Sequence, residues 1–527
     1  MLTPLDSPCS DRQANLSVLG ASLHDILTRL KAEPQRFHKL DLTYSPRDPL
    51  RDPVTLSLPA NGIRLRFDGP EQRLRLVEVV DFSKNHIIFK ERNKERELFK
   101  PPSGPAGSAT ETAEPLTGET AGPLSGPTFR HIYNRFLGPT YDGEFVPGAD
   151  GGREDVGTYV LSYPGVAFSF PMPRAAYSPD KDVVTLLTAS ESQTALSMAV
   201  FSGDSWAQAR ETLWTEVLPS IKTFLPLAKG KDACPDEISL VRIHGGGKLQ
   251  LFRKWTRSSL WISLGETTPQ DLVAELGPPD AIYRKNEQRM YIHKIRTASS
   301  SRTRPGAIEF KRLDDLTDTD QSSAHTASED SNDEAVEEDF AGNVSGECFY
   351  NYFYLGFDVL VSVPGAPSLP PPSSVNSASA IPDGPLKSEA ADRRVATKLI
   401  LHGNVPGSYP FNRHRRCRWE ISYLDDQILA NSETPFSEVE AHLHDEWKSI
   451  YASADEARQR QRGMVLNRGW GHSPGSSCEF LGGWEGDVET GRRGVKASED
   501  STTTLYGFPG LVFEVLKNGF VSAVTVF

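Results

Sequence analysis

The sequence predicts an α+β fold in which units of a short helix followed by an antiparallel sheet repeat and pack into one or two lobes, with disordered loop insertions. The first observation behind this prediction is a glycine followed by hydrophobic residues at alternating positions, which recurs at 62–67, 165–170, 356–361 and 510–515. Alternation at period two is typical of a half-buried strand, and the glycine permits a tight turn where the strand begins. The second observation is a helix-like segment upstream of each of these strands.

Changes of composition divide the chain into units. We expect these units at 16–98, 128–262, 263–425 and 426–527. The stretches between and inside them are polar or rich in Pro, Gly and Ser, and they cannot bury enough apolar surface to offset chain entropy. We therefore expect a disordered linker at 99–127, disordered inserts at 297–346 and 364–392, and a polar loop at 484–503.

The first two units each begin with an apolar helical stripe. In the first, Ser22 is placed to cap a helix, and strands are predicted at 54–58, 63–67 and 74–79. The stripe of this helix consists of Leu23, Ile26, Leu27 and Leu30. The second unit has its stripe at Phe129, Ile132, Tyr133 and Phe136. A strand at 159–170 with a partner at 196–201, a helical stretch at 206–225 and a strand-rich segment at 240–255 should follow.

The third and fourth units share a Thr-Pro helix start, at Thr268 and at Thr434. In the third unit Leu272, Val273 and Leu276 are expected to face inward, and strands are expected at 290–292, 349–353, 356–363 and 397–402. In the fourth unit Val439, Leu443 and Trp447 follow at helical spacing. Asn518-Gly519 lies between strands at 511–516 and 520–526, a dipeptide that favours a type I′ hairpin turn.

Charge and cysteine content exclude several classes of protein. Thirteen acidic and two basic residues at 309–347 account for −11 of the formal net charge of −13, so the rest of the chain is close to neutral. A nucleic-acid binder would show a basic face, and none is expected here. Five scattered cysteines without a CxxC pair fit a reducing compartment. The polar first twenty residues and the lack of a long apolar run lead us to expect no signal peptide and a cytoplasmic protein.

One loop after a predicted strand combines turn formers, aromatic residues and hydrogen-bonding side chains. It offers a candidate partner-binding set, which is His402, Asn404, Pro406, Gly407, Tyr409, Phe411, Asn412 and Arg413. In one interpretation it recognises a protein partner, because aromatic residues and Arg carry much of the binding energy of interfaces. In the other, which the sequence favours, it is a self-packed turn in which Tyr409 and Phe411 fill the core and Asn404 caps backbone groups. Both can hold, since a rigid loop presents contacts well.

No catalytic, cofactor-binding or metal-binding residues are predicted. Residues 471–475 fit the G-x-S-x-G elbow and 244–247 resemble an oxyanion loop, but no histidine follows His472, and that elbow fold places its triad histidine after Ser473. His442 and His444 stand two residues apart, which puts them on different faces of a helix, so a metal site is disfavoured. Cys417 is expected in the core.

Several longer strings are similar to one known family, the phagosome assembly factor family, formerly an uncharacterised Lin-10-like family. The resemblance, to a fungal-type member with disordered insertions, covers most of the ordered chain, and the insertions depart from the compact family pattern. It rests on Leu65-Arg66-Phe67-Asp68, Phe168-Ser169-Phe170, Leu276-Gly277-Pro278-Pro279, Tyr350-Asn351-Tyr352-Phe353, Phe513-Glu514-Val515 and, above all, the string from Leu401 to Asn412.

This resemblance implies a non-enzymatic adaptor in autophagy. It implies a WD-repeat autophagy protein as partner at the phagophore assembly site, with membrane association supplied indirectly by that partner, and it carries no cofactor. An alternative role is Golgi to plasma membrane vesicle trafficking, which the family's older name suggests. A different class of alternative is a lipid or small-molecule binding protein with a groove between helix and sheet, for which a large apolar pocket would be the sign.

Overall fold

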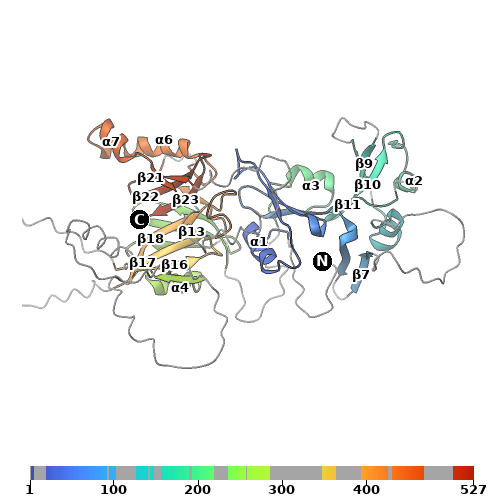
Figure 1. Ribbon diagram of the computed structural model, residues 1–527, viewed down its shortest axis with the longest axis horizontal. Helices are drawn as coiled ribbons and strands as arrows, with labels where there is room; N and C mark the ends of the chain where they lie inside the picture. Colours follow the sequence, from blue (N-terminus) through green and yellow to red (C-terminus); the bar gives the residue numbers. More distant parts are fainter. Residues whose placement is uncertain are drawn as a thin grey trace, which may run out of the picture. The chain divides into compact units, whose positions relative to one another are not determined.

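The chain divides into two compact units, Met1–Asp232 and Ala233–Phe527 (Figure 1). This computed structural model describes residues 2–4, 19–91, 94–101, 126–140, 143–147, 156–188, 193–218, 236–256, 258–284, 347–363, 393–424, 430–467 and 502–527. The predicted insert at 364–392 lies outside the described residues, as do nearly all of the linker at 99–127, the insert at 297–346 and the strand at 290–292. The last two residues of the predicted polar loop at 484–503 already belong to a strand.

An eight-stranded antiparallel sheet forms the first unit, in the order β2-β3-β4-β5-β11-β10-β9-β8. Its strands are β2 (Asp41–Thr43), β3 (Val54–Leu58), β4 (Ile63–Phe67), β5 (Leu74–Val79), β8 (Glu144–Val146), β9 (Val156–Tyr163), β10 (Val166–Pro173) and β11 (Ser197–Val200). A smaller sheet joins β1 (Leu2–Pro4), β6 (Asn85–Glu91) and β7 (Lys94–Phe99). The helical elements are α1 (Leu23–Ala32), η1 (Pro59–Asn61), η2 (Phe82–Lys84), η3 (His131–Phe136), α2 (Val183–Leu187) and α3 (Trp206–Thr212).

The second unit repeats this plan and adds a four-stranded sheet. Its eight-stranded sheet has the order β15-β16-β17-β18-β23-β22-β21-β20, and the other sheet has the order β14-β13-β12-β19. The strands are β12 (Ile238–Ile243), β13 (Lys248–Arg253), β14 (Ser259–Ser263), β15 (Ala281–Arg284), β16 (Cys348–Tyr352), β17 (Phe357–Ser362), β18 (Val395–His402), β19 (Trp419–Ile421), β20 (Met464–Asn467), β21 (Thr502–Phe508), β22 (Leu511–Leu516) and β23 (Val521–Val526). The helices are α4 (Pro269–Leu276), α6 (Phe436–Trp447), η7 (Lys448–Ile450) and α7 (Ala454–Arg460).

Each eight-stranded sheet consists of two four-stranded meanders that meet at their last strands. In the first unit β5 pairs with β11, and in the second unit β18 pairs with β23. The glycine-led strand is the third strand of all four meanders, namely β4, β10, β17 and β22. The four glycines before these strands all have positive φ, from 63° to 91°, as the sequence pattern predicts. The α+β fold made of repeated helix-then-sheet units is therefore confirmed.

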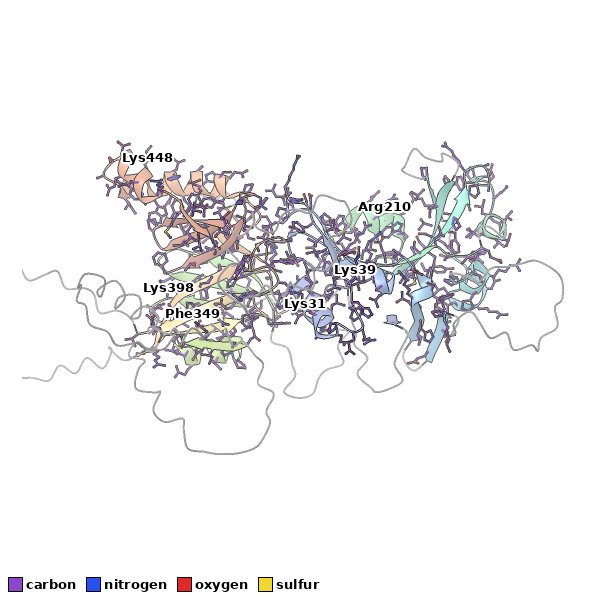
Figure 2. The ribbon with its side chains drawn as sticks, viewed as in Figure 1. Lys31, Lys39, Arg210, Phe349, Lys398 and Lys448 are labelled. Carbon is purple, nitrogen blue, oxygen red and sulfur yellow. The ribbon has the colours of Figure 1, made fainter. Side chains whose placement is uncertain are left out.

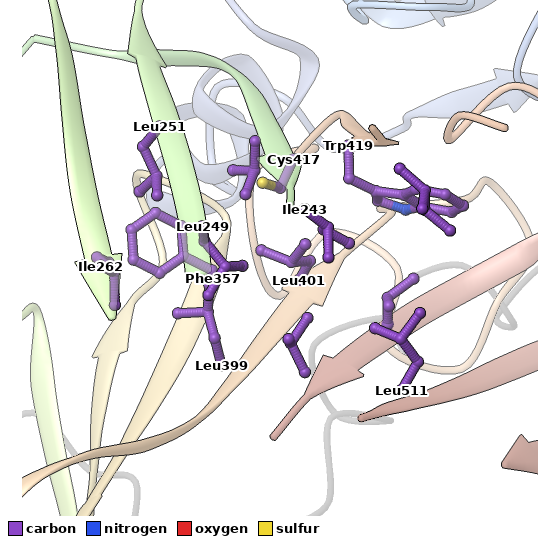
Figure 3. Close-up of a cluster of buried hydrophobic side chains, with 14 of the residues drawn as sticks. Ile243, Leu249, Leu251, Ile262, Phe357, Leu399, Leu401, Cys417, Trp419 and Leu511 are labelled. Carbon is purple, nitrogen blue, oxygen red and sulfur yellow. The ribbon is translucent and has the colours of Figure 1, made fainter. Parts of the chain in front are cut away.

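The core of the second unit lies between its two sheets. Figure 3 shows Leu249, Leu251 and Ile262 of the four-stranded sheet facing Phe357 and Leu399 of the eight-stranded sheet. All five side chains are buried. The alternating pattern of these strands therefore directs one face of each sheet inward, and the opposite face of β17 and β18 carries polar residues such as Asp358 and His402.

Helix starts follow the sequence signals closely where a cap can form. The Ser22 hydroxyl accepts a hydrogen bond from the backbone N–H of Asp25, and Thr268 and Asp271 form a capping box at α4. At α6 the prediction was less accurate, because Pro435 occupies the cap position and Thr434 instead donates its hydroxyl to Asn431. No helix among the described residues is long and apolar enough to cross a membrane.

Four local predictions were wrong. The strand expected at 159–170 is a hairpin, since Gly165 turns the chain between β9 and β10. Val273 is 40% exposed, because α4 directs only Leu272 and Leu276 inward. The helical stretch expected at 206–225 ends at Thr212 among the described residues, and 219–225 lie outside them. At the last hairpin only Gly519 has positive φ, so the turn is a three-residue loop with a glycine bulge and not type I′.

Candidate functional site

The loop that the sequence singled out joins β18 to β19 and folds back onto the polar face of β17. We call residues 403–414 the β18–β19 loop. Backbone hydrogen bonds fix both of its ends, from the N–H of Gly403 to the carbonyl of Ser522 (2.8 Å) and from the N–H of Arg415 to the carbonyl of Phe353 (2.9 Å). The loop is thereby tied to β23 and to the β16–β17 turn.

Local backbone geometry inside the loop depends on two asparagines. Asn404 and Asn412 have φ values of 45° and 63°, in the left-handed region that asparagine tolerates better than most residues. The side-chain Oδ1 of Asn404 accepts a hydrogen bond from the backbone N–H of Asn412 (2.7 Å), and the hydroxyl of Ser408 donates to the carbonyl of Val405 (2.7 Å). The loop therefore closes on itself through its own polar side chains.

A buried ion pair stabilises the start of the loop. Arg416 donates from Nη1 to the carbonyl of Gly403 (2.7 Å) and from Nη2 to Glu433 (2.9 Å), which Arg418 also reaches (2.9 Å). Burial favours the protonated form of Glu433, but the hydrogen bond from Arg418 and the charges of both arginines outweigh it, so the pKa of Glu433 is lowered. The Glu433 carboxylate therefore stays ionised and keeps its ion pair with Arg416, which in turn binds the carbonyl of Gly403 at the start of the loop.

A second buried pair lies at the other end of the loop. Arg415 forms an ion pair with Glu237 (3.0 Å), and its guanidinium lies 3.8 Å from the centre of the Tyr354 ring. Both charged side chains are about 5% exposed. Since a planar guanidinium stacks well on an aromatic ring, this arrangement orients Arg415 and fixes the chain just after the loop.

Three titratable side chains meet where the loop crosses β17. Asp358 accepts hydrogen bonds from Nε2 of His402 and Nε2 of His414, both at 2.8 Å. The two imidazole rings are stacked, with centres 3.7 Å apart and planes 14° from parallel, and the ring centres of Phe353 and His414 are 4.8 Å apart. We call these three residues the Asp358 cluster.

Burial and pairing set the charges within this cluster. Burial opposes ionisation of Asp358, yet the hydrogen bonds from the two histidines hold its pKa well below the usual range. Burial, with the nearby His402 as a further cause, lowers the pKa of His414 to about 4. At neutral pH the cluster therefore contains a carboxylate and a neutral His414 imidazole, whose Nε2 proton lies toward Asp358.

The structure places the predicted partner-binding residues in three groups by burial. Asn404, Pro406 and Asn412 are buried, whereas Gly407 and Arg413 are exposed. Three further members, His402, Tyr409 and Phe411, are half-buried. Asn404 caps a backbone group as the self-packed interpretation expects, but Tyr409 and Phe411 remain half-buried and do not fill the core. Recognition of a protein partner by this loop stays a prediction.

The remaining candidates from the sequence are dispersed. His244 lies in the β12–β13 turn and contacts Ser422 (3.0 Å), while the 471–475 motif lies outside the described residues. His442 and His444 lie on α6, and His444 pairs with Glu440 (3.5 Å). Cys417 is buried, as predicted, and burial raises the pKa of its thiol to about 12.

Sequence reasoning missed Asp358 and His414 as partners of His402. Asp358 is 44 residues before His402 in the chain, and most of the residues between them form the predicted insert. A usable signal existed in the strand pattern, because Asp358 and His402 both occupy the polar positions of adjacent strands. The register between those strands was the missing information.

Comparison with known proteins agrees with the strings quoted above. The family model described as Phagosome assembly factor 1 matches residues 15–99, 119–310 and 389–527. Much of the predicted linker and of the two inserts falls between the matched ranges, whereas the polar stretch 484–503 falls inside one. No solved structure matches the chain significantly.

Relatives from plants and animals extend over nearly the whole chain. A PHAF1 protein of Arabidopsis thaliana is 22% identical over 97% of this chain and 89% of its own length. PHAF1 proteins of Drosophila melanogaster and Caenorhabditis elegans are each 21% identical, over 97% of this chain and 90% of theirs. Because the family model matches most of the sequence, the chain belongs to the phagosome assembly factor 1 family.

Proposed function

We propose that this chain is a non-enzymatic adaptor in autophagy, which acts with a WD-repeat protein at the site where the autophagosome forms. The family description, a phagosome assembly factor, supports the general process. The partner and the place come from the family resemblance of the sequence. In this proposal the partner supplies the contact with the membrane, and the chain itself provides a protein-binding surface.

The observation that supports a binding role most directly is the rigid β18–β19 loop. Its buried asparagines and the Arg416–Glu433 pair fix the backbone, while Arg413 is exposed and Tyr409 and Phe411 are half-buried. A loop that is ordered before binding loses little conformational entropy in the complex. Arg and Tyr are also the residue types that carry much of the energy at protein interfaces.

The buried thiol beside the loop is not suited to act as a nucleophile. A cysteine nucleophile reacts as the thiolate, which needs a pKa near or below neutral pH. Burial raises the pKa of Cys417 to about 12, so this thiol stays protonated at neutral pH. Cys417 therefore packs in the hydrophobic core, next to Gly356.

The test compares two double variants of the full chain, purified from starved and from fed cells. Tyr409→Ala with Arg413→Ala alters the loop without touching its buried asparagines. Lys448→Ala with Tyr451→Ala removes the same residue classes, a cation and a tyrosine, next to the end of α6, where Lys448 is exposed (Figure 2). Circular dichroism and thermal melting first establish that both variants are folded.

We expect a WD-repeat protein to co-purify with the wild type and with the Lys448/Tyr451 variant, and to be lost with the Tyr409/Arg413 variant. Retention of that partner by both variants would place the binding surface elsewhere. If no stable partner accompanies the wild type under either condition, the adaptor proposal is overturned, and lipid binding becomes the next function to test with vesicles.

A further inference from the structure

We propose that Asp358, His402 and His414 form a binding site for a divalent transition-metal ion of the Zn²⁺ class. The site does not depend on the proposed function, and it lies on the described part of the second unit. Among the described residues, these three are the group of His, Cys, Asp and Glu side chains whose ligand atoms lie close enough to share an ion, all within 4.8 Å of one another.

The ligands come from rigid and independent parts of the fold. Asp358 lies on β17, His402 is the last residue of β18, and His414 ends the β18–β19 loop. Both histidines direct Nε2 toward the same carboxylate, at 2.8 Å. The hydrogen bonds therefore bring the three side chains together before any ion binds, which reduces the cost of ordering them.

The donor set selects the kind of ion. Two imidazole nitrogens and one carboxylate suit Zn²⁺ and neighbouring first-row ions, whereas Ca²⁺ and Mg²⁺ prefer all-oxygen sites. Three protein ligands leave a fourth position for water, because His402 and Asp358 are 16% and 13% exposed.

Binding requires two adjustments. The protons on Nε2 of His402 and of His414, which now point at Asp358, must move to Nδ1 through solvent, because a metal ion binds the lone pair of an unprotonated imidazole nitrogen. The second adjustment concerns the orientation of the rings. Imidazole nitrogens bind a metal ion in the plane of the ring, so two stacked rings cannot both point at one ion at about 2.0–2.1 Å. His414 is 4% exposed and contacts both the His402 and the Phe353 rings, which restricts its rotation. His402 is the more exposed ring, and a turn about its side-chain bonds would bring its Nε2 toward an ion bound by the other two residues.

The ion would replace hydrogen bonds that now hold the β18–β19 loop against β17. Metal–ligand bonds are stronger and directional, so an occupied site would hold the loop more rigidly than the hydrogen bonds do. We therefore expect Zn²⁺ to raise the melting temperature of the folded chain in addition to binding it. This second readout reports on the fold and does not require any partner protein.

The experiment measures Zn²⁺ binding to the full chain by competition with a chromophoric chelator, and Co²⁺ binding by its visible absorption. His402→Gln is the informative variant, because glutamine keeps an N–H group near Asp358 but removes the imidazole ligand. His442→Gln is the matched control, since His442 lies on α6 and is not part of the Asp358 cluster. Circular dichroism establishes that both variants fold.

We expect one equivalent of Zn²⁺ bound by the wild type and by His442→Gln, with the rise in melting temperature in both, and loss of that equivalent and of the rise in His402→Gln. Either of two results overturns the proposal. One is a wild type that binds no stoichiometric Zn²⁺ and gives no Co²⁺ spectrum. The other is a His402→Gln variant that binds as tightly as the wild type, which would show that the Asp358 cluster is a hydrogen-bonded clamp only.

Discussion

Asn404 and Asn412 close the β18–β19 loop through a single hydrogen bond, from the backbone N–H of Asn412 to the side-chain oxygen of Asn404 at 2.7 Å. Both residues are buried and both have left-handed backbone angles. The conformation that exposes Arg413 therefore depends on the side chain of Asn404 and on the left-handed backbone at both asparagines.

Replacing Asn404 by alanine is expected to lower the free energy of unfolding by about 1–3 kcal/mol, because the buried N–H of Asn412 loses its acceptor. Alanine also tolerates the left-handed angle less well than asparagine. Asn404→Gly removes the same acceptor without the left-handed backbone penalty, and it is the comparison that isolates the hydrogen bond. Urea denaturation followed by circular dichroism measures both, and an alanine variant as stable as the wild type would contradict this account of the loop.

The composition of this loop was visible in the sequence, but its arrangement was not. Turn formers, aromatic residues and the Asn404 cap follow from local chemistry, which acts over a few residues. The Asp358 cluster and the Arg416–Glu433 pair depend on which strands are neighbours and in which register, and that information resides in the tertiary fold. Half-burial of Tyr409 likewise depends on what surrounds the loop.

Glu433→Gln is expected to reduce the free energy of unfolding at pH 7 by about 3–5 kcal/mol, since it leaves Arg416 buried without its counter-charge. The pKa of Glu433 is lowered in the folded protein, from an ordinary value of about 4.3. Its stabilising effect is therefore complete above about pH 5 and declines as the pH falls through the folded pKa.

The difference between wild type and Glu433→Gln should consequently be largest at neutral pH and shrink below about pH 4. Urea titrations at a series of pH values measure this difference. Glu438→Gln, at an exposed position in the first turn of α6, is the control and should show little effect at any pH. A pH-independent difference for Glu433 would show that its charge is not what stabilises the fold.

Two glycines have similar backbone angles but different surroundings, so their alanine variants distinguish backbone strain from steric crowding. Gly356 and Gly519 have φ values of 91° and 83°, and a Cβ at Gly519 would meet nothing within 4 Å. A Cβ at Gly356 would meet the carbonyl oxygen of Arg415 and the Cβ of Cys417. We expect Gly519→Ala to cost about 1–2 kcal/mol and Gly356→Ala about 2–5 kcal/mol by urea denaturation. Equal losses of stability at the two positions would mean that the contacts around Gly356 do not exclude a larger side chain there.

The repeated glycine-led pattern predicted the architecture of the sheets better than the individual helix and strand assignments did. A period-two pattern after a glycine located β4, β10, β17 and β22, because the strand needs one buried face and the turn before it needs positive φ. The same pattern could not show that two meanders join edge to edge. That joining depends on the last strand of each meander, such as β5 and β11, finding a partner far along the chain.

β23 pairs on both sides, with β18 and with β22, so the last strand of the chain lies in the middle of its sheet. Val521, Val524 and Val526 are at most 2% exposed. Deleting 521–527 should therefore abolish cooperative unfolding of the second unit, as measured by near-ultraviolet circular dichroism during thermal melting, because it separates two meanders and opens the core. Deleting Phe527 alone, which is 49% exposed, is the control and should leave the transition intact. If the longer deletion still gave a sharp native-like transition, the joining of the two meanders through β23 would be wrong.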